Sequence, residues 1–481
     1  MIIVSQKLEN ILKEKGPVKK IGVIGMGYVG IPAAALFADS DRFDHVLGFQ
    51  RDSPSSGYKI EMLNRGESPL KGEEPGLEEL LKKVTDAGKF ECTPDFSRIS
   101  ELDAVTLAIQ TPFADPKALE PDFGALKEGI RNVGRYLKPG ILVVLESTIT
   151  PGTTEGMARE ILEEESGLKA GEDFALAHAP ERVMVGRLLK NIQEHDRIVG
   201  GIDKPSTDRA VELYSPVLTK GKVIPMSATA AEVTKTAENT FRDLQIAAAN
   251  QLALYCEAMG INVYDVRAGI DSLKGEGITR AILWPGAGVG GHCLTKDTYH
   301  LERGVKLGSE SLDYPQDAES IYVLARRVND FMPAHMYNLT VAALKRINMD
   351  IKDAKIAMLG WAFINDSDDA RNPPSEPYRD LVLEAGADIK VHDPHVLSYP
   401  DVELFKDSND VIKGADAVVI FTGHREYFNL KPGDIKKLTG KEHTVIIDGR
   451  NVIDPDTFIN AGFVYKGIGR GDMNSHHIID K

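Results

Sequence analysis

The segment PGAGVGGHCLTKD, residues 285–297, combines a thiol with features that make a thiol reactive. Its glycines let the backbone approach a substrate closely, and Gly290 is a candidate for such an approach. Lys296 and Asp297 follow Cys293 within four residues, and a cation beside a thiol favours the reactive thiolate. A lone cysteine is more often a small buried apolar side chain than a nucleophile. The interpretation of Cys293 as a nucleophile therefore needs support from a second feature of the sequence.

That support comes from IGVIGMGYVGIP, residues 21–32, which is typical of a dinucleotide-binding turn between a strand and a helix. The first glycine permits the tight turn, the second lets the backbone reach a pyrophosphate, and the third allows close helix–strand packing. The helix that follows points its N-terminus at the phosphates. The predicted cofactor contacts here are Gly25, Gly27, Tyr28, Val29 and Gly30. A nicotinamide cofactor together with a thiol indicates an oxidation that passes through a covalent thioester.

The position that normally holds the cofactor's ribose departs from the usual pattern. An acidic residue is expected about 20 residues after the glycines, but the sequence reads GFQRDS at residues 48–53, with Gln50 in that place. Arg51 would accept the 2′-phosphate of NADP, whereas Asp52 would bind the ribose hydroxyls of NAD. We favour Asp52 and NAD.

Hydroxyl residues follow two further predicted strands, in IQTP (109–112) and ESTITPGTT (146–154). At the carboxyl edge of a parallel sheet, Thr111 and Thr148 would line the cofactor crevice. Spacing alone equally allows ordinary loops in which a threonine caps a helix.

Two other groups of polar residues have the types that a catalytic site uses. Glu181 and Arg182 follow a short predicted strand in AHAPERVMVGR (177–187). They would either belong to a catalytic site or form an ion pair in an exposed loop. Lys235 and Asn239 are four residues apart in a predicted helix and therefore share one face, although such residues are usually just solvated.

Alternating apolar runs and helical patterns place these residues on an α/β framework. Strands are predicted at 21–25, 45–49, 104–109 and 141–146, with helices at 28–38 and 122–136. Continuous Val/Ile/Leu runs between helices are typical of a parallel sheet covered on both faces. The alternation returns at 354–363, 376–385, 388–394 and 415–423, and the strands at 20–27 and 102–112 resemble those at 355–362 and 415–424. The sequence therefore predicts two doubly wound, Rossmann-like domains.

Residues 227–259 contain neither glycine nor proline and have apolar positions at helical spacing, so they predict one long helix that ends at Gly260. About 33 residues would extend about 50 Å, which exceeds one small domain and suggests a dimer surface. Because 481 residues exceed one hydrophobic core, we expect three domains. These are an N-terminal cofactor domain (1–215), a central helical domain (216–332) and a C-terminal Rossmann-like domain (333–481).

Composition narrows the class of protein further. A net charge of −15 argues against nucleic acid as a general partner, since phosphate backbones need a basic surface. Three cysteines are too few for a disulfide framework, and no cysteine–histidine grouping has zinc spacing, so no metal is expected. There is no signal-peptide pattern and no apolar run of about 18 residues. We therefore expect a cytoplasmic protein without membrane association.

Taken in order, these motifs resemble the UDP-glucose/GDP-mannose dehydrogenase family. The matching stretches are GMGYVG, ESTITPGTT, APERV, the Lys-x₃-Asn of KTAEN, GGHC-x₃-D and DDARNPPSEP, and they extend from about residue 20 to 470. The resemblance implies oxidation of the C6 alcohol of a nucleotide sugar to a carboxylate with two NAD⁺. It also implies a homodimer and a C-terminal domain that carries the UDP half.

The resemblance also implies roles for individual residues. Cys293 would be the nucleophile, Lys235 and Asn239 would hold the oxyanion, and water activated near Glu181 and Asp297 would release the acid. Thr148 would position that water or the substrate hydroxyl. The implied cofactor contacts also include Thr111, Thr148, Lys296 and Arg371, and the implied substrate contacts are Glu181, Arg182, Lys235, Asn239, Gly290 and Arg280, the last from the neighbouring subunit.

Within the family, GGHC is similar to the branch that acts on UDP-N-acetylhexosamines, whose products serve surface polysaccharide or glycan synthesis. The continuation LTKD departs from that branch, so UDP-glucose remains the alternative substrate. A single-step hydroxyacid dehydrogenase would need neither the cysteine nor a second nucleotide-type domain. A non-catalytic nucleotide-binding protein would not need Cys293 or Lys235. His292 would either tune the thiol or only pack.

Overall fold

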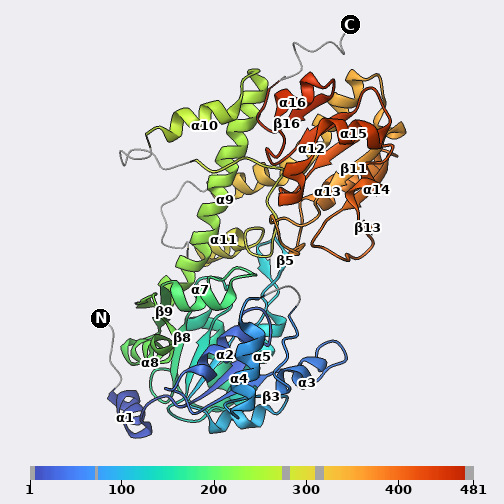
Figure 1. Ribbon diagram of the computed structural model, residues 1–481. Coiled ribbons are helices and arrows are strands. Elements are labelled where there is room, and N and C mark those ends of the chain that lie inside the picture. Colours follow the sequence, from blue (N-terminus) through green and yellow to red (C-terminus); the bar gives the residue numbers. More distant parts are fainter. Residues whose placement is uncertain (1–5, 71–73, 274–281, 309–318, 472–481) are drawn as a thin grey trace. The chain divides into compact units, whose positions relative to one another are not determined.

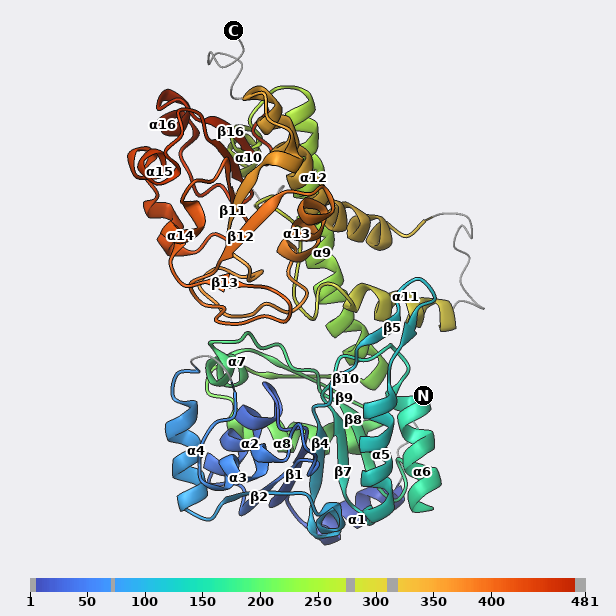
Figure 2. The same cartoon turned by 90° about the vertical axis from the view of Figure 1, so that its right-hand side faces the viewer.

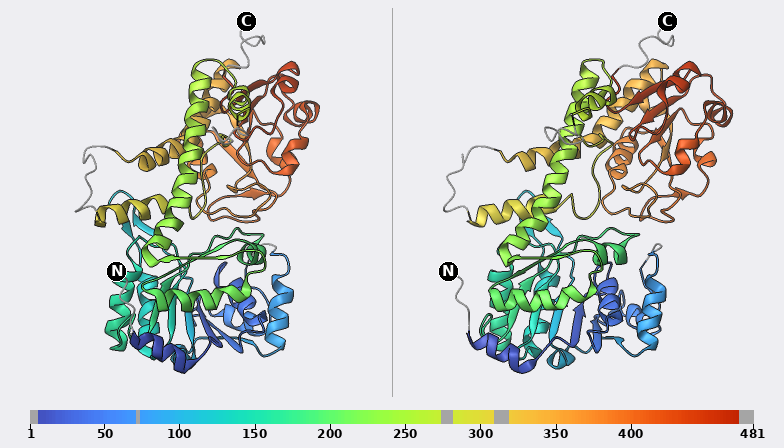
Figure 3. Two further views of the ribbon diagram at one scale, coloured as in Figure 1. Left: turned by 90° about the vertical axis from the view of Figure 1, so that its left-hand side faces the viewer. Right: turned by 60° about the vertical axis from the view of Figure 1, so that its left-hand side comes forward.

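The computed structural model describes residues 6–70, 74–273, 282–308 and 319–471. The chain forms two compact units. Unit 1 contains Met1–Glu238 and Tyr299–Tyr314, and unit 2 contains Asn239–Thr298 and Pro315–Lys481. Helix α9 (Ala228–Ala258) is one unbroken helix of 31 residues, about 46 Å long, and contributes residues to both units (Figure 3). The predicted long helix is confirmed.

The strands of unit 1, coloured blue to green in Figure 1, form one eight-stranded sheet. Their order in the sheet is β10-β9-β8-β7-β4-β1-β2-β3. All neighbours pair in parallel except β8 and β9, which are antiparallel. The strands are β1 (Lys20–Ile24), β2 (His45–Phe49), β3 (Phe90–Thr93), β4 (Ala104–Leu107), β7 (Leu142–Leu145), β8 (Ala175–His178), β9 (Arg197–Gly201) and β10 (Val223–Ser227). A separate hairpin pairs β5 (Phe113–Asp115) with β6 (Glu120–Pro121).

Helices cover both faces of this sheet because its strands are apolar on both sides (Figure 2). Val23 packs into a core cluster with residues of α2, α4 and α8, whereas its neighbour Ile24 packs into a second cluster with residues of α5 and α6. The helices of unit 1 are α1 (Gln6–Lys15), α2 (Gly30–Asp39), α3 (Tyr58–Asn64), α4 (Leu77–Asp86), η1 (Phe96–Glu101), α5 (Gly124–Tyr136), η2 (Thr154–Ala158), α6 (Arg159–Ser166), α7 (Leu188–Glu194), α8 (Lys204–Tyr214) and η3 (Ser215–Val217). Helix α11 (Asp297–Gly308) begins in unit 2 and continues in unit 1.

Unit 2 contains a six-stranded, fully parallel sheet with the order β13-β12-β11-β14-β15-β16. Its strands are β11 (Lys355–Leu359), β12 (Asp388–His392), β13 (Leu404–Phe405), β14 (Ala417–Ile420), β15 (Val445–Asp448) and β16 (Val464–Gly467). One face packs on residues of α9, α12 and α13, and the other on residues of α14, α15 and α16. The helices are α10 (Val263–Asp271), α12 (Ile321–Arg346), η6 (Ile351–Asp353), α13 (Ser375–Glu384), α14 (Ser408–Ile412), η7 (Arg425–Asn429), α15 (Pro432–Thr439) and α16 (Pro455–Asn460).

The predicted internal resemblance corresponds to an equivalent strand order. In unit 1 the strands β7-β4-β1-β2-β3 follow one another, and in unit 2 the equivalent run is β15-β14-β11-β12-β13. Strands β1 and β11, like β4 and β14, therefore occupy matching central places. This confirms the prediction of two doubly wound domains. No helix among the described residues is long and apolar enough to span a membrane.

Candidate functional site

The dinucleotide turn lies between β1 and α2, as predicted. Each of its glycines is required for a different structural reason. Gly25 has φ +99°, and a Cβ there would lie 2.5 Å from the carbonyl oxygen of Ala108. A Cβ at Gly30 would overlap the carbonyl oxygen of Gly25. At Gly27, by contrast, a Cβ would meet no described atom within 4 Å. The turn therefore leaves open space beside Gly27, as a cradle for a ligand requires.

A cavity of about 340 Å³ opens at this turn. Gly25 and Gly27 line it together with Gln50, Arg51 and Lys59. The Lys59 ammonium donates to the Met26 carbonyl at 2.9 Å, and burial lowers the pKa of this lysine. Asp52, the predicted ribose partner, is not among the lining residues, whereas Gln50 and Arg51 are. Tyr28 and Val29 lie half-buried in the turn just before α2.

The loops after β4 and β7 meet at the carboxyl edge of the sheet. The Thr111 hydroxyl donates to the Thr148 carbonyl oxygen at 2.5 Å. His300 joins the same two loops, with its Nδ1 3.1 Å from the Thr150 hydroxyl and its Nε2 3.4 Å from the Thr111 carbonyl oxygen. Thr111 is buried and Thr148 half-buried, so the structure brings these two predicted residues together.

Glu181 is buried and forms an ion pair with Arg197, whose second amino group lies 3.0 Å from the Glu146 carboxylate. The Tyr214 hydroxyl donates to the same Glu146 carboxylate at 2.6 Å. Arg197 thus fixes Glu181 within unit 1. Arg182 bonds to the carbonyl oxygen of Asp196 and points an amino group at Glu238, 3.7 Å away.

Lys235 lies on α9 with only 8% of its surface exposed, and its ammonium has no hydrogen-bond partner in the described part of unit 1. One turn earlier, Glu232 binds the loop that follows β7. Its carboxylate accepts hydrogen bonds from the amides of Gly152 (2.5 Å) and Thr154 (2.8 Å) and from the Thr154 hydroxyl (2.6 Å). Burial raises the pKa of Glu232 to about 7, although these hydrogen bonds oppose the shift. Glu232 therefore anchors the Thr148–Thr154 loop to α9.

The thiol loop in unit 2 presents Cys293 as an exposed thiol, whereas Cys92 and Cys256 are buried. Three of its glycines, Gly288, Gly290 and Gly291, pack too tightly for a side chain. A Cβ at Gly290 would lie 2.6 Å from the Phe363 Cβ, and Gly288 and Gly291 have φ of +123° and +93°. The close approach that these glycines permit is therefore to the 363–374 loop.

Behind the thiol, three predicted residues form one buried polar group. The Asn239 amide donates to the Asp297 carboxylate at 2.6 Å, and the Lys296 ammonium lies 3.2 Å from its other oxygen. Asp297 is fully buried at the start of α11, and its amide donates to the Cys293 carbonyl at 2.9 Å. The arrangement ties the thiol-bearing residue directly to this group. Lys296, predicted to bind cofactor, is paired with Asp297 here.

A second buried network, which the sequence reasoning missed, supports both ends of the thiol loop. Asn250 accepts from the Gly286 amide at 2.9 Å and donates to Asn329 at 2.8 Å. Asn329 donates to Asp243, which also binds Arg326 at 2.6 Å, and Arg326 donates to the Leu294 carbonyl at 3.5 Å. Isolated amides and charges on helices give no sequence signal of such a network. Arg197 was missed too, although Glu146, an acid that directly follows a buried strand, required a partner.

Arg371 and His292 lie near one another in unit 2. Arg371 forms a bidentate ion pair with Asp369, at 2.8 and 2.5 Å, and its carbonyl accepts from the Gly291 amide at 2.9 Å. Burial, with Lys296 and Arg371 nearby, lowers the pKa of His292 to about 4. His292 is therefore uncharged at neutral pH. Arg280 lies outside the described residues.

Comparison with known proteins shows which family the chain belongs to. The UDP-glucose/GDP-mannose dehydrogenase family matches in three parts: its NAD binding domain at residues 19–218, its central domain at 229–321 and its UDP binding domain at 357–455. A UDP-N-acetyl-D-mannosamine dehydrogenase of Pyrococcus horikoshii is 38% identical over 454 residues, which cover 94% of this chain and all of the relative.

Two solved structures extend the comparison. A crystal structure titled NDP-N-acetyl-D-galactosaminuronic acid dehydrogenase, from Methanosarcina mazei Go1, is 78% identical with a TM-score of 0.91, covering 98% of this chain and 99% of that one. A UDP-glucose dehydrogenase of Pyrobaculum islandicum is 27% identical with a TM-score of 0.77, covering 94% and 98%. The chain therefore belongs to the UDP-glucose/GDP-mannose dehydrogenase family and is an NAD-dependent nucleotide-sugar dehydrogenase.

Proposed function

We propose that this enzyme oxidises the C6 hydroxyl of a UDP-N-acetylhexosamine to the carboxylate, with Cys293 as the covalent nucleophile. NAD⁺, when bound, would supply the hydride acceptor for both oxidations, and Gly25, Gly27 and Gln50 line the cavity that would hold it. The observation that carries the proposal is the exposed Cys293 thiol beside the buried Lys296, Asp297 and Asn239. The product, a nucleotide-linked uronic acid, would supply surface polysaccharide or glycan synthesis.

In the proposed sequence, the Cys293 thiolate attacks the carbon of the C6 aldehyde left by the first oxidation and forms a C–S bond. Loss of the second hydride from that carbon converts the thiohemiacetal into a thioester. Water then attacks the thioester carbonyl, the C–S bond breaks, and the sugar leaves as a carboxylate while the thiol is restored. His292 is uncharged at neutral pH, so we assign stabilisation of the thiolate to Lys296, whose ammonium is also paired with Asp297.

The other predicted residues have contacts that suit their proposed roles. Lys235 is buried and has no hydrogen-bond partner among the described residues of unit 1, so its ammonium could stabilise an oxyanion. Asn239 is already oriented by Asp297 and would supply a second donor. Glu181, held by Arg197, and Asp297 would activate the hydrolytic water, and Thr148 would position it.

We propose separate binding sites for the cofactor and for the UDP half of the substrate. We propose that the cavity lined by Gly25, Gly27 and Gln50 holds the cofactor and that Arg371 also contacts it. Arg182 and Gly290 would contact the substrate, and the 333–481 domain would hold the UDP half. The domain boundaries 1–215, 216–332 and 333–481, the homodimer and the crossing of Arg280 to the partner's site remain proposals.

The N-acetylated sugar is supported by two names among the relatives: the P. horikoshii protein is a UDP-N-acetyl-D-mannosamine dehydrogenase, and the 78% identical M. mazei protein is titled an N-acetyl-D-galactosaminuronic acid dehydrogenase. A pocket that hydrogen-bonds a buried acetamido group leaves polar groups unpaired when a plain hydroxyl is bound. Such a loss can discriminate by a factor of about 10⁴.

The test is a kinetic comparison of UDP-glucose with UDP-N-acetylglucosamine, UDP-N-acetylgalactosamine and UDP-N-acetylmannosamine, following the reduced cofactor with NAD⁺ and with NADP⁺. We expect one N-acetylated sugar to have the highest kcat/KM and to yield two NADH per sugar. One NADH per sugar would exclude the four-electron reaction. Faster turnover of UDP-glucose would support the alternative, UDP-glucose 6-dehydrogenase. Equal kcat/KM with NADP⁺ would show that Arg51, and not Asp52, governs cofactor choice.

A Cys293→Ser variant tests the nucleophile separately. A serine hydroxyl is a poor nucleophile at neutral pH, so formation of the acid should stop while binding of NAD⁺, measured by calorimetry, stays unchanged. Acid formation at the wild-type rate would overturn the thioester mechanism.

A further inference from the structure

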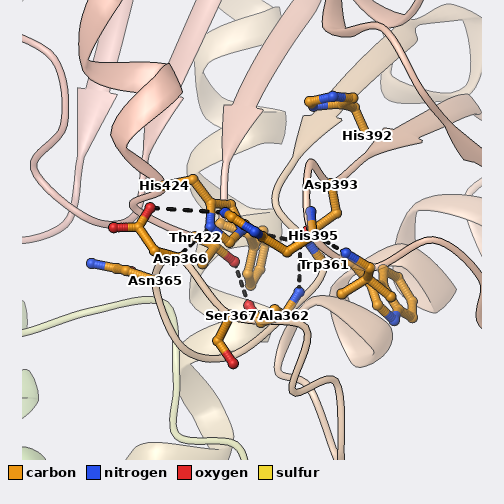
Figure 4. Close-up of polar contacts among 12 residues, drawn as sticks. Trp361, Ala362, Asn365, Asp366, Ser367, His392, Asp393, His395, Thr422 and His424 are labelled. Atoms are coloured by element: carbon orange, nitrogen blue, oxygen red, sulfur yellow. Dashed lines mark hydrogen bonds and ion pairs between the residues drawn. The ribbon is translucent and has the colours of Figure 1, made fainter. Parts of the chain in front are cut away.

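Three side chains from separate loops of unit 2 converge at the carboxyl edge of its sheet (Figure 4). Asp366 follows β11, His395 follows β12 and His424 follows β14. One ligand atom from each lies within 4.8 Å of the others. Strands β12, β11 and β14 are neighbours, and the strand order reverses between β11 and β14. In doubly wound sheets, the crevice beside such a reversal is where ligands bind.

His424 presents a lone pair to this cluster because a carboxylate fixes its tautomer. Its Nε2 lies 3.1 Å from the Asp393 carboxylate, which only accepts hydrogen bonds, so the proton is on Nε2. Its Nδ1 accepts the Asp366 amide at 2.9 Å and therefore carries the lone pair. A carboxylate behind a histidine is the usual second partner of a metal-binding imidazole.

Asp393 is itself held rigidly. It accepts hydrogen bonds from the amides of Trp361 (2.7 Å) and Ala362 (2.9 Å) through one oxygen and from those of His395 (2.8 Å) and Val396 (2.9 Å) through the other. These four hydrogen bonds and the one from His424 hold the Asp393 carboxylate in a fixed orientation behind the imidazole.

The other two ligands are more accessible. The side chains of Asp366 and His395 are 32% and 38% exposed, and Asp366 Oδ1 lies 3.9 Å from His395 Nε2. His392, the nearby histidine, is not part of the cluster, and its Nδ1 is bonded to the Tyr427 hydroxyl at 2.9 Å. Two imidazoles and one carboxylate, open to water on one side, suit a borderline transition metal better than Mg²⁺ or Ca²⁺.

We propose that Asp366, His395 and His424 form a binding site for a divalent transition metal of the zinc class. Around tetrahedral zinc the donor atoms would be about 3.3 Å apart, given Zn–N and Zn–O bonds of about 2.0 to 2.2 Å. The three ligand atoms, which lie within 4.8 Å of one another, therefore have to move closer together, and the partly exposed imidazole of His395 is free to shift for this purpose.

Metal binding affects three existing contacts, one of which is the hydrogen bond from the Arg425 amide to Asp366 Oδ1 at 3.0 Å. The metal replaces the Asp366 amide as the partner of His424 Nδ1. It also competes with Arg425, whose Nε lies 2.9 Å from Asp366 Oδ2 but whose side chain is 90% exposed. An exposed ion pair of this kind contributes little stability, so its loss opposes metal binding only weakly. The bound ion would fasten the loops after β11, β12 and β14 to one another.

The experiment is a calorimetric titration of the full-length chain with Zn²⁺, repeated with Co²⁺ to follow visible absorption. An exposed cysteine and a pair of adjacent histidines are ligand types that zinc also accepts, so the parent protein for the titration carries C293S, H476A and H477A. His395→Ala and Asp366→Asn are the test variants, because both side chains are partly exposed and their loss leaves the core intact. His443→Ala and Asp368→Asn are matched controls outside the cluster.

We expect one ion per parent chain, a rise in melting temperature on adding Zn²⁺, and affinity weakened roughly tenfold or more in each test variant. The two controls should bind as the parent does, and Co²⁺ absorption should diminish only in the test variants. Absence of stoichiometric binding in the parent, or equal affinity in parent and test variants, would overturn the proposal. None of these measurements depends on the chemistry proposed for Cys293.

Discussion

Replacing Gly290 with alanine should displace the thiol loop and sharply reduce activity without unfolding the protein. Gly290 is buried three residues before Cys293. A Cβ there would lie 2.6 Å from the Phe363 Cβ, 2.7 Å from the Asn372 carbonyl oxygen and 2.9 Å from the Pro374 Cδ. Neither a Cβ atom, nor a carbonyl oxygen, nor a proline ring can rotate away. The backbone of one of the two loops must therefore move.

The size of the effect follows from these contacts. Ordinary van der Waals contact begins at 3.4 Å, so the loops must separate by about 0.8 Å at Gly290. Overpacking of this kind reduces the free energy of unfolding by about 1–3 kcal/mol, which a domain of ordinary stability survives. A displacement approaching 1 Å at a reacting group lowers the rate by about 10²-fold. We therefore expect a folded protein with kcat/KM reduced by roughly two orders of magnitude.

The assay combines initial rates of NADH formation with the rate of alkylation of Cys293 by iodoacetamide and with urea unfolding. Because Cys92 and Cys256 are buried, alkylation of the native protein reports on Cys293. Gly269→Ala is the matched control, since Gly269 lies in α10 with no described atom within 4 Å of its would-be Cβ. It should gain up to about 1 kcal/mol of stability and keep full activity. If G290A has the kcat/KM of the wild type and its Cys293 is alkylated at the wild-type rate, the inference that the substitution displaces the thiol loop is wrong.

Three other outcomes are expected. Because the pKa of Glu232 is raised from its ordinary value of 4.5 to about 7, its contribution to stability is complete below pH 4.5 and is lost as pH rises through 7. Glu232→Gln should flatten this part of the stability–pH curve in urea unfolding, and an unchanged slope would contradict the assignment. Asn250→Ala leaves the Gly286 amide unpaired and should reduce the free energy of unfolding by about 1–3 kcal/mol and alter Cys293 alkylation, whereas loss of stability alone would mean that the network does not position the thiol. Phe241 and Tyr255 on α9 are 54% and 58% exposed, so we expect a homodimer in light scattering, and a monomer at micromolar concentration would exclude it.

The sequence by itself determined the framework, because the fold depends on local signals. The runs IGVIG and AVTLAI consist almost entirely of apolar residues and alternate with helical patterns, which is typical of parallel strands buried on both faces. Neighbouring backbone atoms leave no room for a Cβ at Gly25 or Gly30, so both positions require glycine. The dinucleotide turn is therefore visible in the sequence. The absence of glycine and proline over 227–259 likewise sufficed for α9. Cys293 with Lys296 and Asp297 was recognisable because the three are adjacent in the chain.

Only the tertiary structure decided which distant polar residues meet. Asn239 and Asp297 are 58 residues apart, and the pairing of Glu181 with Arg197 depends on how β9 lies beside β8 in the sheet. The cluster of Asp366, His395 and His424 is the clearest case, because the sequence analysis found no metal-ligand spacing. Parallel strands bring their carboxyl ends to one edge of a sheet, so loops far apart in the sequence become neighbours there. Spacing along the chain records only local neighbours, whereas strand order, which sets these contacts, results from the packing of the whole domain.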